Sequence, residues 1–299
     1  MKGLQMMLNR RNMLQSAAIA VGATAGFALT GTPRVFADDA ELYSGGAPWA
    51  DLLGWRLGCQ AYSFNRFTFE EAVQKNASLG LRVIEGYPGQ KLTKSVGAGL
   101  GPGLNKEQRL LAKEILVSHG VKIVNFGVTG AGRDTFDFAA DMGIETICTE
   151  PNFKELENVS KLADEYQINV ALHNHPKPTP YWDYKIVLEH IANLSPRVGA
   201  CADTGHYLRS GLNPLEAIKA LKGHIVSFHF KDLVNEEGKG WHDVPWGTGI
   251  VDIPVILAEL KEQRFKGVFS IEYEYNWENS LPEIAKSVEY FNEQAKKMA

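Results

Sequence analysis

The sequence contains little cysteine, and its cysteines follow no regular spacing. Only three are present among 299 residues, Cys59, Cys148 and Cys201, and each lies inside an apolar segment that predicts a strand. An odd number without close spacing argues against a disulfide framework and against a thiolate metal site. We therefore expect buried, unreactive thiols that pack as small apolar side chains.

Motifs of nucleotide-binding and serine-hydrolase folds are missing as well. The chain has no GxGxxG after its first predicted strand, no GxxxxGK(S/T) loop and no GxSxG turn. These absences argue against a Rossmann dinucleotide site, a P-loop and a nucleophile elbow. The chemistry must come from other residues.

The first 37 residues have the pattern of an export signal. Arg10 and Arg11 precede a run rich in alanine and glycine, residues 16–31, and Val35 and Ala37 offer a cleavage point after Ala37. The twin arginines resemble a Tat signal, which predicts a periplasmic or secreted protein. The alternative is an uncleaved anchor, but the run is shorter than the roughly 20 residues of a spanning helix. We expect no stable membrane insertion after cleavage.

Basic residues do not dominate the remaining chain. The whole sequence has a net charge of −4, and residues 1–37 hold four basic residues and no acidic one, so residues 38–299 carry −8. Such a surface repels phosphate backbones and anionic membranes. Nucleic acid is therefore not an expected partner.

Apolar runs and amphipathic stretches alternate along residues 38–299, which predicts one domain of the α/β class. Apolar residues recur in the longer stretches at steps of three and four, as in helices with one buried face. The shorter runs are continuously apolar, as in parallel strands covered on both sides. Eight such units in 262 residues, close to the roughly 250 typical of the fold, predict a single (β/α)8 TIM barrel. The strands are expected at 57–64, 82–88, 121–129, 144–151, 169–176, 198–206, 225–232 and 267–274, and the helices at 68–80, 105–120, 134–143, 152–166, 182–194, 213–223, 252–263 and 280–299.

Polar side chains follow many of these strands, at the end of a barrel where active sites lie. Residues two apart in a strand share a face, so each strand end can direct two side chains toward the mouth. The set comprises Glu85, Glu150, His173, His175, Asp203, His206, His229, Lys231, Glu272 and Glu274.

Carboxylates and imidazoles that converge in this way predict a divalent cation. Several acids facing one another would otherwise repel, and some would have to take up protons. Mixed oxygen and nitrogen ligands without cysteine favour Mn²⁺, Mg²⁺, Co²⁺ or Zn²⁺. A structural role for Asp203, His229 and Glu272 together would require three unrelated polar burials. A single histidine such as His206 is more often hydrogen-bonded scaffold, and Glu85 is expected behind the ligands.

Four motifs on strands six to eight resemble a known family. The stretches ADTGH, FHFKD, WGTGIVD and IEYE, in this order, are similar to those of the xylose isomerase-like TIM barrels, which include sugar phosphate isomerases and epimerases, ketose 3-epimerases and, more distantly, endonuclease IV. The resemblance implies metal ligands at His173, Asp203, His229 and Glu272. It also implies a substrate contact at His206 and assigns the motif lysine to Lys231.

One departure concerns the first of these ligands. Where the epimerases carry glutamate in an ENH-like stretch, this sequence has His173-Asn174-His175. An imidazole that binds a metal has no lone pair left to abstract a proton. Glu150 is therefore a further candidate, as ligand or as base. Asn174 would brace the loop or bond sugar hydroxyls, and His175 would support the ligands from behind or contact substrate.

The resemblance implies a metal-dependent sugar isomerase or epimerase that acts through a metal-stabilised enediolate on a ketose or aldose. Glu150 or Glu272 would take the proton, and Lys231 or His206 would polarise or protonate an oxygen. Some of the aromatic residues near the strand ends would line the sugar pocket, namely Tyr62, Phe64, Tyr87, Trp182, Trp246, Tyr273 and Trp277.

Three other functions remain open at this point. A lyase or hydratase acting on 3-keto-glycosides would use the same enolate chemistry, and export favours it because glycosides occur outside the cytoplasm. A DNA repair endonuclease is opposed by the charge of residues 38–299 and by the export signal. A sugar-binding protein without catalysis would keep the pocket and lose the base. The expected partner is a small carbohydrate, and assembly into a homo-oligomer is left open.

Overall fold

The computed structural model describes residues 43–299. The predicted export signal, residues 1–37, lies outside these residues, so it stays a prediction. Between residues 43 and 299, each helix is too short or too polar to cross a bilayer.

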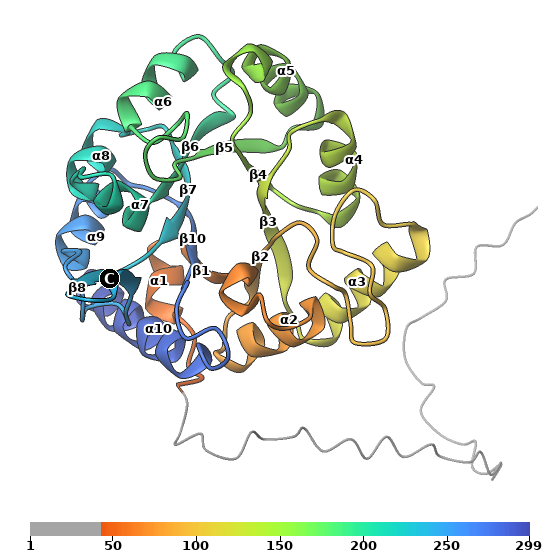
Figure 1. Cartoon of the computed structure of the whole chain (residues 1–299), viewed down its shortest axis with the longest axis horizontal. Helices are drawn as coiled ribbons and strands as arrows, with labels where there is room; N and C mark the ends of the chain where they lie inside the picture. Colours follow the sequence, from red (N-terminus) through yellow and green to blue (C-terminus); the bar gives the residue numbers. More distant parts are fainter. Residues whose placement is uncertain (1–42) are drawn as a thin grey trace, which may run out of the picture. The chain divides into compact units, whose positions relative to one another are not determined.

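Eight parallel strands close into a barrel, as the sequence predicts (Figure 1). Around the barrel the order is β1-β10-β7-β6-β5-β4-β3-β2. Each barrel strand therefore pairs with the barrel strand that follows it in sequence, and the last, β10, pairs with the first, β1. The two additional strands, β8 and β9, form a separate hairpin. The bounds are β1 Trp55–Gln60, β2 Val83–Gly86, β3 Lys122–Thr129, β4 Thr146–Thr149, β5 Asn169–His173, β6 Val198–Asp203, β7 Ile225–Phe230, β8 Leu233–Glu236, β9 Gly240–Asp243 and β10 Gly267–Ile271.

The helices form a ring outside the barrel (Figure 1). Side-chain caps fix several of their starts, for example Thr68 with Glu71 at α2 and Asn105 with Gln108 at α3. The bounds are α1 Pro48–Leu52, α2 Phe69–Ser78, α3 Lys106–Ser118, α4 Arg133–Met142, α5 Leu156–Tyr166, α6 Tyr184–Ile191, α7 Thr204–Arg209, α8 Pro214–Ala220, α9 Ile253–Glu262 and α10 Leu281–Lys296, with 3₁₀ turns η1 Ala61–Phe64 and η2 Phe153–Glu155.

Strand six ends earlier than the sequence predicts. The segment expected to be a strand through His206 turns into α7 after Asp203, whose Oδ1 accepts the backbone N–H of His206 at 2.7 Å. Aspartate is a favourable residue at this position because its carboxylate satisfies an N–H that the helix leaves unpaired. The early helix start places His206 on α7 directly beside the strand end.

The long connection after strand seven is more ordered than its polar sequence suggests. It contains the β8–β9 hairpin, and its return path is held by Asp232, whose carboxylate accepts the backbone N–H groups of Gly247, Gly249 and Val251. A side chain on Gly249 would collide with Asp232, since an added Cβ would lie 2.1 Å from its Oδ1. The GTG segment is therefore a backbone cradle for one buried carboxylate.

Candidate metal centre

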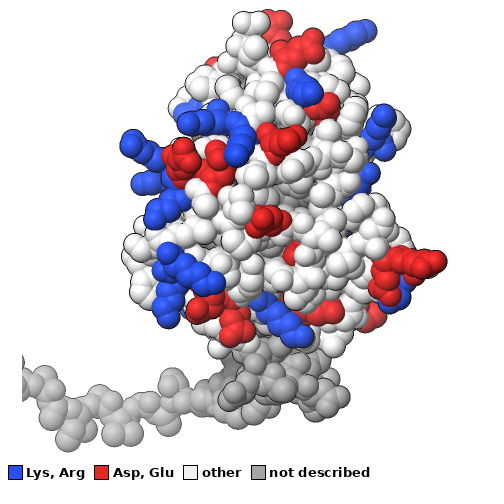
Figure 2. Space-filling view, turned by 90° about the vertical axis from the view of Figure 1, so that its left-hand side faces the viewer, with Lys and Arg blue, Asp and Glu red and all other residues white. Residues whose placement is uncertain are grey.

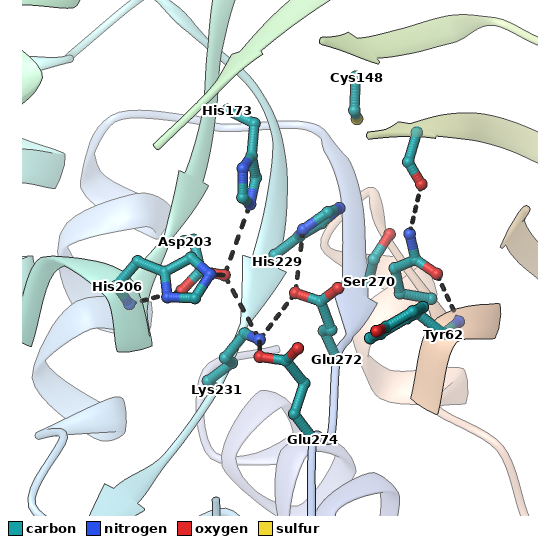
Figure 3. A network of polar contacts seen from close by, with 12 residues as sticks. Tyr62, Cys148, His173, Asp203, His206, His229, Lys231, Ser270, Glu272 and Glu274 are labelled. Atoms are coloured by element: carbon teal, nitrogen blue, oxygen red, sulfur yellow. Dashed lines mark hydrogen bonds and ion pairs between the residues drawn. The ribbon is translucent and has the colours of Figure 1, made fainter. Parts of the chain in front are cut away.

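Four side chains from adjacent strands meet at the carboxyl end of the barrel (Figure 3). His173 ends β5, Asp203 ends β6, His229 lies in β7, and Glu272 directly follows β10. One ligand atom from each of the four lies within 4.8 Å of the others. The strand pairing produces this arrangement, because Asp203 is in register with His229 and His229 with Ser270.

Three of these four residues have a buried polar atom without a hydrogen-bond partner. The atoms are His173 Nε2, Asp203 Oδ2 and His229 Nδ1. His173 Nε2 lies 3.6 Å from Asp203 Oδ2, and His229 Nδ1 lies 3.1 Å from Glu272 Oε2 without the angle of a hydrogen bond. Leaving such atoms unpaired costs free energy, about 1–3 kcal/mol each. A divalent cation among them would satisfy all three, and the donor set fits one.

The other nitrogen of each histidine is held by a carboxylate. His173 Nδ1 lies 2.9 Å from Glu150 Oε1, and His229 Nε2 lies 2.9 Å from Glu85 Oε1. Glu85 is itself fixed, because Ser270 Oγ donates to its second oxygen at 2.5 Å. In the neutral imidazole that binds a metal, a carboxylate that accepts from one nitrogen places the proton there and leaves a lone pair on the other. Both lone pairs then point at the common centre.

Glu150 does not share that centre, which corrects its prediction as a fifth ligand. Its Oε1 lies on the outer side of His173 and also accepts from the backbone N–H and Nδ1 of His175, at 3.1 and 2.6 Å. Burial alone would raise the pKa of Glu150, but the bonds from the two histidines outweigh it and lower the pKa to about 2. Glu150 Oε1 is already engaged by both histidines, and Glu150 does not line the mouth pocket described below, so the geometry does not favour it as the proton acceptor.

Lys231 lies among the carboxylates of Asp203, Glu272 and Glu274, whose charge it offsets (Figure 3). Its Nζ is 2.8 Å from Glu272 Oε2, 2.5 Å from Glu274 Oε2 and 3.6 Å from Asp203 Oδ2. Burial would lower the pKa of Lys231, but these carboxylates raise it well above its usual value. The ammonium therefore keeps its proton at neutral pH. A proton held this tightly argues against Lys231 as the group that protonates substrate, and its role in polarising a substrate oxygen stays a prediction.

For Asn174, the structure supports the first of its two predicted roles, that of a brace. Its side chain is buried, its Nδ2 donates to the Asp203 carbonyl at 3.1 Å, and its Oδ1 accepts the Asp203 N–H at 2.8 Å. Both ends of the amide are engaged with the backbone of one residue. Asn174 thus fixes the end of β6 against the end of β5.

A pocket of about 360 Å³ opens above the four ligands. His175, His206 and Glu272 line it, so these three predicted site residues reach the space in which a substrate would bind. Tyr62 and Tyr87 form one wall, with ring centres 5.2 Å apart, and Trp277 packs edge-on against Tyr62. The complete lining is Gln60, Tyr62, Tyr87, Pro88, Gly127, Val128, His175, His206, Glu272 and Glu274.

Trp246 lies away from this pocket, contrary to its prediction as a substrate contact. Only 2% of its surface is exposed, and its ring packs against Phe230 at 4.9 Å and Phe291 at 5.6 Å. It fills the space between β7 and α10. Its place in a loop motif next to the strand ends gave the wrong expectation, because sequence does not show which way a loop side chain turns.

Two residues of the site are absent from the predicted set. Arg209 donates through Nη1 to His206 Nδ1 at 3.1 Å, and Gln60 at the end of β1 lines the pocket and bonds the Gly127 carbonyl at 2.6 Å. Gln60 obeys the same strand-end rule as the predicted residues. Arg209 is recognisable only once α7 is known, since it follows His206 by one helical turn.

All three cysteines are buried and free, as expected. The structure adds that Cys148 and Cys201 lie near His229, with one atom of each within 4.8 Å. His229 Nε2 is held by Glu85 and its Nδ1 lies beside Glu272. Both nitrogens of His229 are therefore engaged in the candidate centre, and neither is left as a ligand for a metal at the two thiols. The two thiols pack with Ala171 and Val226 beneath the candidate centre.

Surface charges of both signs are interspersed on the side of the molecule shown in Figure 2, which carries no extended area of Lys and Arg alone. The mouth pocket likewise has two carboxylates and no Lys or Arg among its lining residues. Neither surface has the concentration of positive charge that proteins use to bind the phosphates of a nucleic acid.

Residues 114–294 match the xylose isomerase-like TIM barrel family, which is more than half of the chain. An uncharacterized protein of Methanocaldococcus jannaschii is 24% identical over 164 residues, which is 47% of this chain and 54% of that protein. The match thus spans about half the length of this curated relative. The crystal structure of an uncharacterized protein from Parabacteroides distasonis is 30% identical, with a TM-score of 0.65, and covers 82% of this chain and 100% of its own.

Two more distant structures share the fold. D-allulose 3-epimerase from Methylomonas sp., solved with D-allulose, is 15% identical with a TM-score of 0.62 and covers 80% of this chain and 97% of its own. A xylose isomerase-like TIM barrel protein from Mycobacterium smegmatis, solved with magnesium, is 13% identical with a TM-score of 0.65 and covers 81% and 97%. At these identities the likeness concerns the fold.

Proposed function

This chain belongs to the xylose isomerase-like TIM barrel family, and we propose that it is a divalent-metal-dependent sugar isomerase or epimerase. The observation that carries the proposal is the trio of unpaired buried atoms, His173 Nε2, Asp203 Oδ2 and His229 Nδ1, clustered with Glu272, which lines the mouth pocket. The magnesium complex and the allulose complex of the two distant relatives are in keeping with it.

His173, Asp203, His229 and Glu272 would hold the cation, which supplies the positive charge that stabilises an enediolate. Glu272 is the residue best placed to accept a carbon-bound proton. Glu272 lines the pocket. Burial would raise the pKa of Glu272, but Lys231 and His229 outweigh this effect and hold the pKa well below its usual value. Glu272 is therefore ionised at neutral pH and faces the substrate space.

His206 is suited to hydrogen-bond a sugar oxygen as a neutral imidazole. Burial, together with Lys231, outweighs Asp203 and lowers the pKa of His206 to about 2. Because Arg209 donates to Nδ1, the imidazole proton resides on Nε2, which lies 3.5 Å from Asp203 Oδ2. The ring then presents an N–H that can polarise an oxygen bound in the pocket.

The pocket favours an uncharged sugar over a sugar phosphate. Its lining contains two acids, Glu272 and Glu274, and no Lys or Arg, so apart from the metal a phosphate would find no positive charge there to pair with. Tyr62 and Tyr87 line the pocket and provide apolar faces on which a sugar ring can pack, and Trp277 packs edge-on against Tyr62.

A carbon–oxygen lyase acting on 3-keto-glycosides is the second candidate, and the histidine at position 173 favours it. With Nδ1 bonded to Glu150 and Nε2 turned to the metal centre, His173 offers no proton acceptor on its side of the pocket. Epimerisation at one carbon needs an acceptor on each face, whereas elimination or isomerisation needs one base and one acid.

We also propose that residues 1–37 are a Tat-type signal that directs residues 38–299, a single domain, to the periplasm or the outside of the cell. The support is the twin-arginine sequence and the small-residue cleavage point. N-terminal sequencing of protein recovered from the periplasm tests this, and an N-terminus other than Asp38 would contradict it.

The decisive experiment measures metal content and proton exchange in the same preparation. Purified protein is analysed for bound metals, depleted by chelation, and incubated in D₂O with free ketoses, aldoses and 3-keto-glucosides. The proposal expects deuterium at the carbon next to the carbonyl only in the metal-loaded sample. Aglycone release from 3-keto-glucosides without exchange into free sugars would select the lyase, and full activity after thorough chelation would refute both.

A further inference from the structure

A second hollow lies beside the mouth pocket and shares only Val128 and Glu150 with the site described above. It has a volume of about 590 Å³ and lies where β3 and β4 end and the first turns of α4 and α5 begin. Its lining is Val128, Thr129, Gly130, Ala131, Gly132, Thr149, Glu150, Pro151, Asn152, Glu155, Asn158 and Val159.

The hollow adjoins the mouth pocket along one wall. Val128 lines both spaces. Glu150 on the side of the hollow is bonded to His175 on the side of the pocket, with 2.6 Å between Glu150 Oε1 and His175 Nδ1. A ligand bound above the metal centre therefore needs to pass only Val128 and the His175–Glu150 pair to reach the hollow.

The chemistry of the hollow suits an uncharged group rich in hydroxyls. Thr129, Asn152 and Asn158 supply side-chain donors and acceptors, and the charged residues of the lining are the acids Glu150 and Glu155. Glu155 Oε2 already accepts the Asn152 N–H at 3.0 Å, so it is committed to the turn before α5. No lining residue is basic, and this excludes a good fit for a phosphate or a carboxylate.

We propose that the substrate extends beyond the reacting sugar ring and that its second, uncharged sugar residue binds in this hollow. The proposal rests on the function proposed above and narrows its substrate class to glycosylated sugars. The mouth pocket alone, at about 360 Å³, is near the lower end of the range of about 300–1,000 Å³ for ligand sites. The adjoining hollow gives room for a second ring.

Gly130 allows the hollow to be filled without disturbing the fold. A Cβ added to Gly130 meets nothing within 4 Å, and the backbone there is not left-handed. Gly103 has the same two properties and lines neither space. The pair Gly130→Tyr and Gly103→Tyr therefore makes the same chemical change inside and outside the hollow.

The test compares D-fructose with 4-O- and 6-O-glucosyl-D-fructose, using the metal-loaded full chain and its two variants. Binding is followed by calorimetry and proton exchange by deuterium incorporation. At least one disaccharide is expected to bind the parent protein more tightly than fructose does. Gly130→Tyr is expected to weaken that binding about tenfold or more, with fructose binding unchanged and Gly103→Tyr without effect.

Two results would overturn the proposal. One is that fructose binds at least as tightly as both disaccharides, and the other is that Gly130→Tyr affects fructose and disaccharide equally. Failure of the proposed function is a separate outcome. Disaccharide binding that is lost in Gly130→Tyr, without deuterium exchange into any sugar, keeps the second subsite and contradicts the enzyme.

Discussion

Two histidines of the centre are each held by a glutamate, His229 by Glu85 in the inner pair and His173 by Glu150 in the outer pair. The nitrogen–oxygen distance is 2.9 Å in both pairs, but the surroundings differ. His229 and Glu85 are both completely buried, and Ser270 and Asn125 also contact Glu85. His173 is buried as well, but its partner Glu150 is 15% exposed and shares its oxygen with His175, which is 43% exposed. The inner pair belongs to the barrel core, and the outer pair links the centre to the mouth.

This difference has a physical consequence. A charge effect is strongest where water is excluded and is screened where water enters. We therefore expect Glu85 to strengthen metal binding by His229 more than Glu150 strengthens metal binding by His173. The following variants test this comparison, beginning with the residue that lies between the two histidines.

Asp203→Asn should have the largest effect. It removes the charge of the oxygen that lies 3.6 Å from His173 Nε2 and clusters with His229, while the amide oxygen can still cap α7 by accepting the His206 N–H. We expect metal affinity to fall by more than about 100-fold, beyond the range for residues that only support ligands. Calorimetric titration with Mn²⁺ and Mg²⁺ measures it, and near-normal affinity in a folded variant would remove Asp203 from the ligand set.

Glu85→Gln should come next. Glutamine keeps the volume and can still accept from His229 Nε2, but it lacks the charge that makes the imidazole a stronger ligand. We expect a 10- to 100-fold loss of metal affinity, near the upper limit for a residue behind a ligand. Thermal unfolding of the metal-free variant serves as the control for folding. An unchanged affinity would show that the inner pair is structural only.

Glu150→Gln should lower metal affinity by about tenfold, the lower limit of the same range, because solvent reaches this carboxylate. The ratio between the Glu85→Gln and Glu150→Gln effects is the direct measure of the comparison. Equal losses, or a larger loss at Glu150, would mean that burial does not set the strength of the two pairs.

His175→Ala should have the smallest effect on the metal. His175 contacts Glu150 and lines the pocket, and it is not among the four converging ligands. Metal affinity should stay unchanged, while KM for the sugar rises about fivefold, the value of one hydrogen bond of about 1 kcal/mol. Steady-state kinetics beside a metal titration separate the two quantities. Loss of metal would instead place the cation between Glu150, His173 and His175.

The strand-end rule placed His173, Asp203, His229 and Glu272 within a larger set of candidates, because parallel strands bring their carboxyl ends to one edge whatever their sequence order. The resemblance of the strand motifs to a known family then singled out these four as ligands. Neither gives the direction of a side chain: Glu150 follows β4 but lies on the outer side of His173, and Trp246, expected in the pocket, packs in the core.

The amino-acid sequence by itself determined the barrel, its eight strands and the identity of the groups at its mouth. Those features depend on hydrophobic period and residue type, which are local properties of the chain. Only the tertiary structure decided which oxygen or nitrogen faces which neighbour, how much water reaches each acid, and that a second hollow lies beside the first. These depend on directions and distances between residues far apart in sequence, which no local pattern contains.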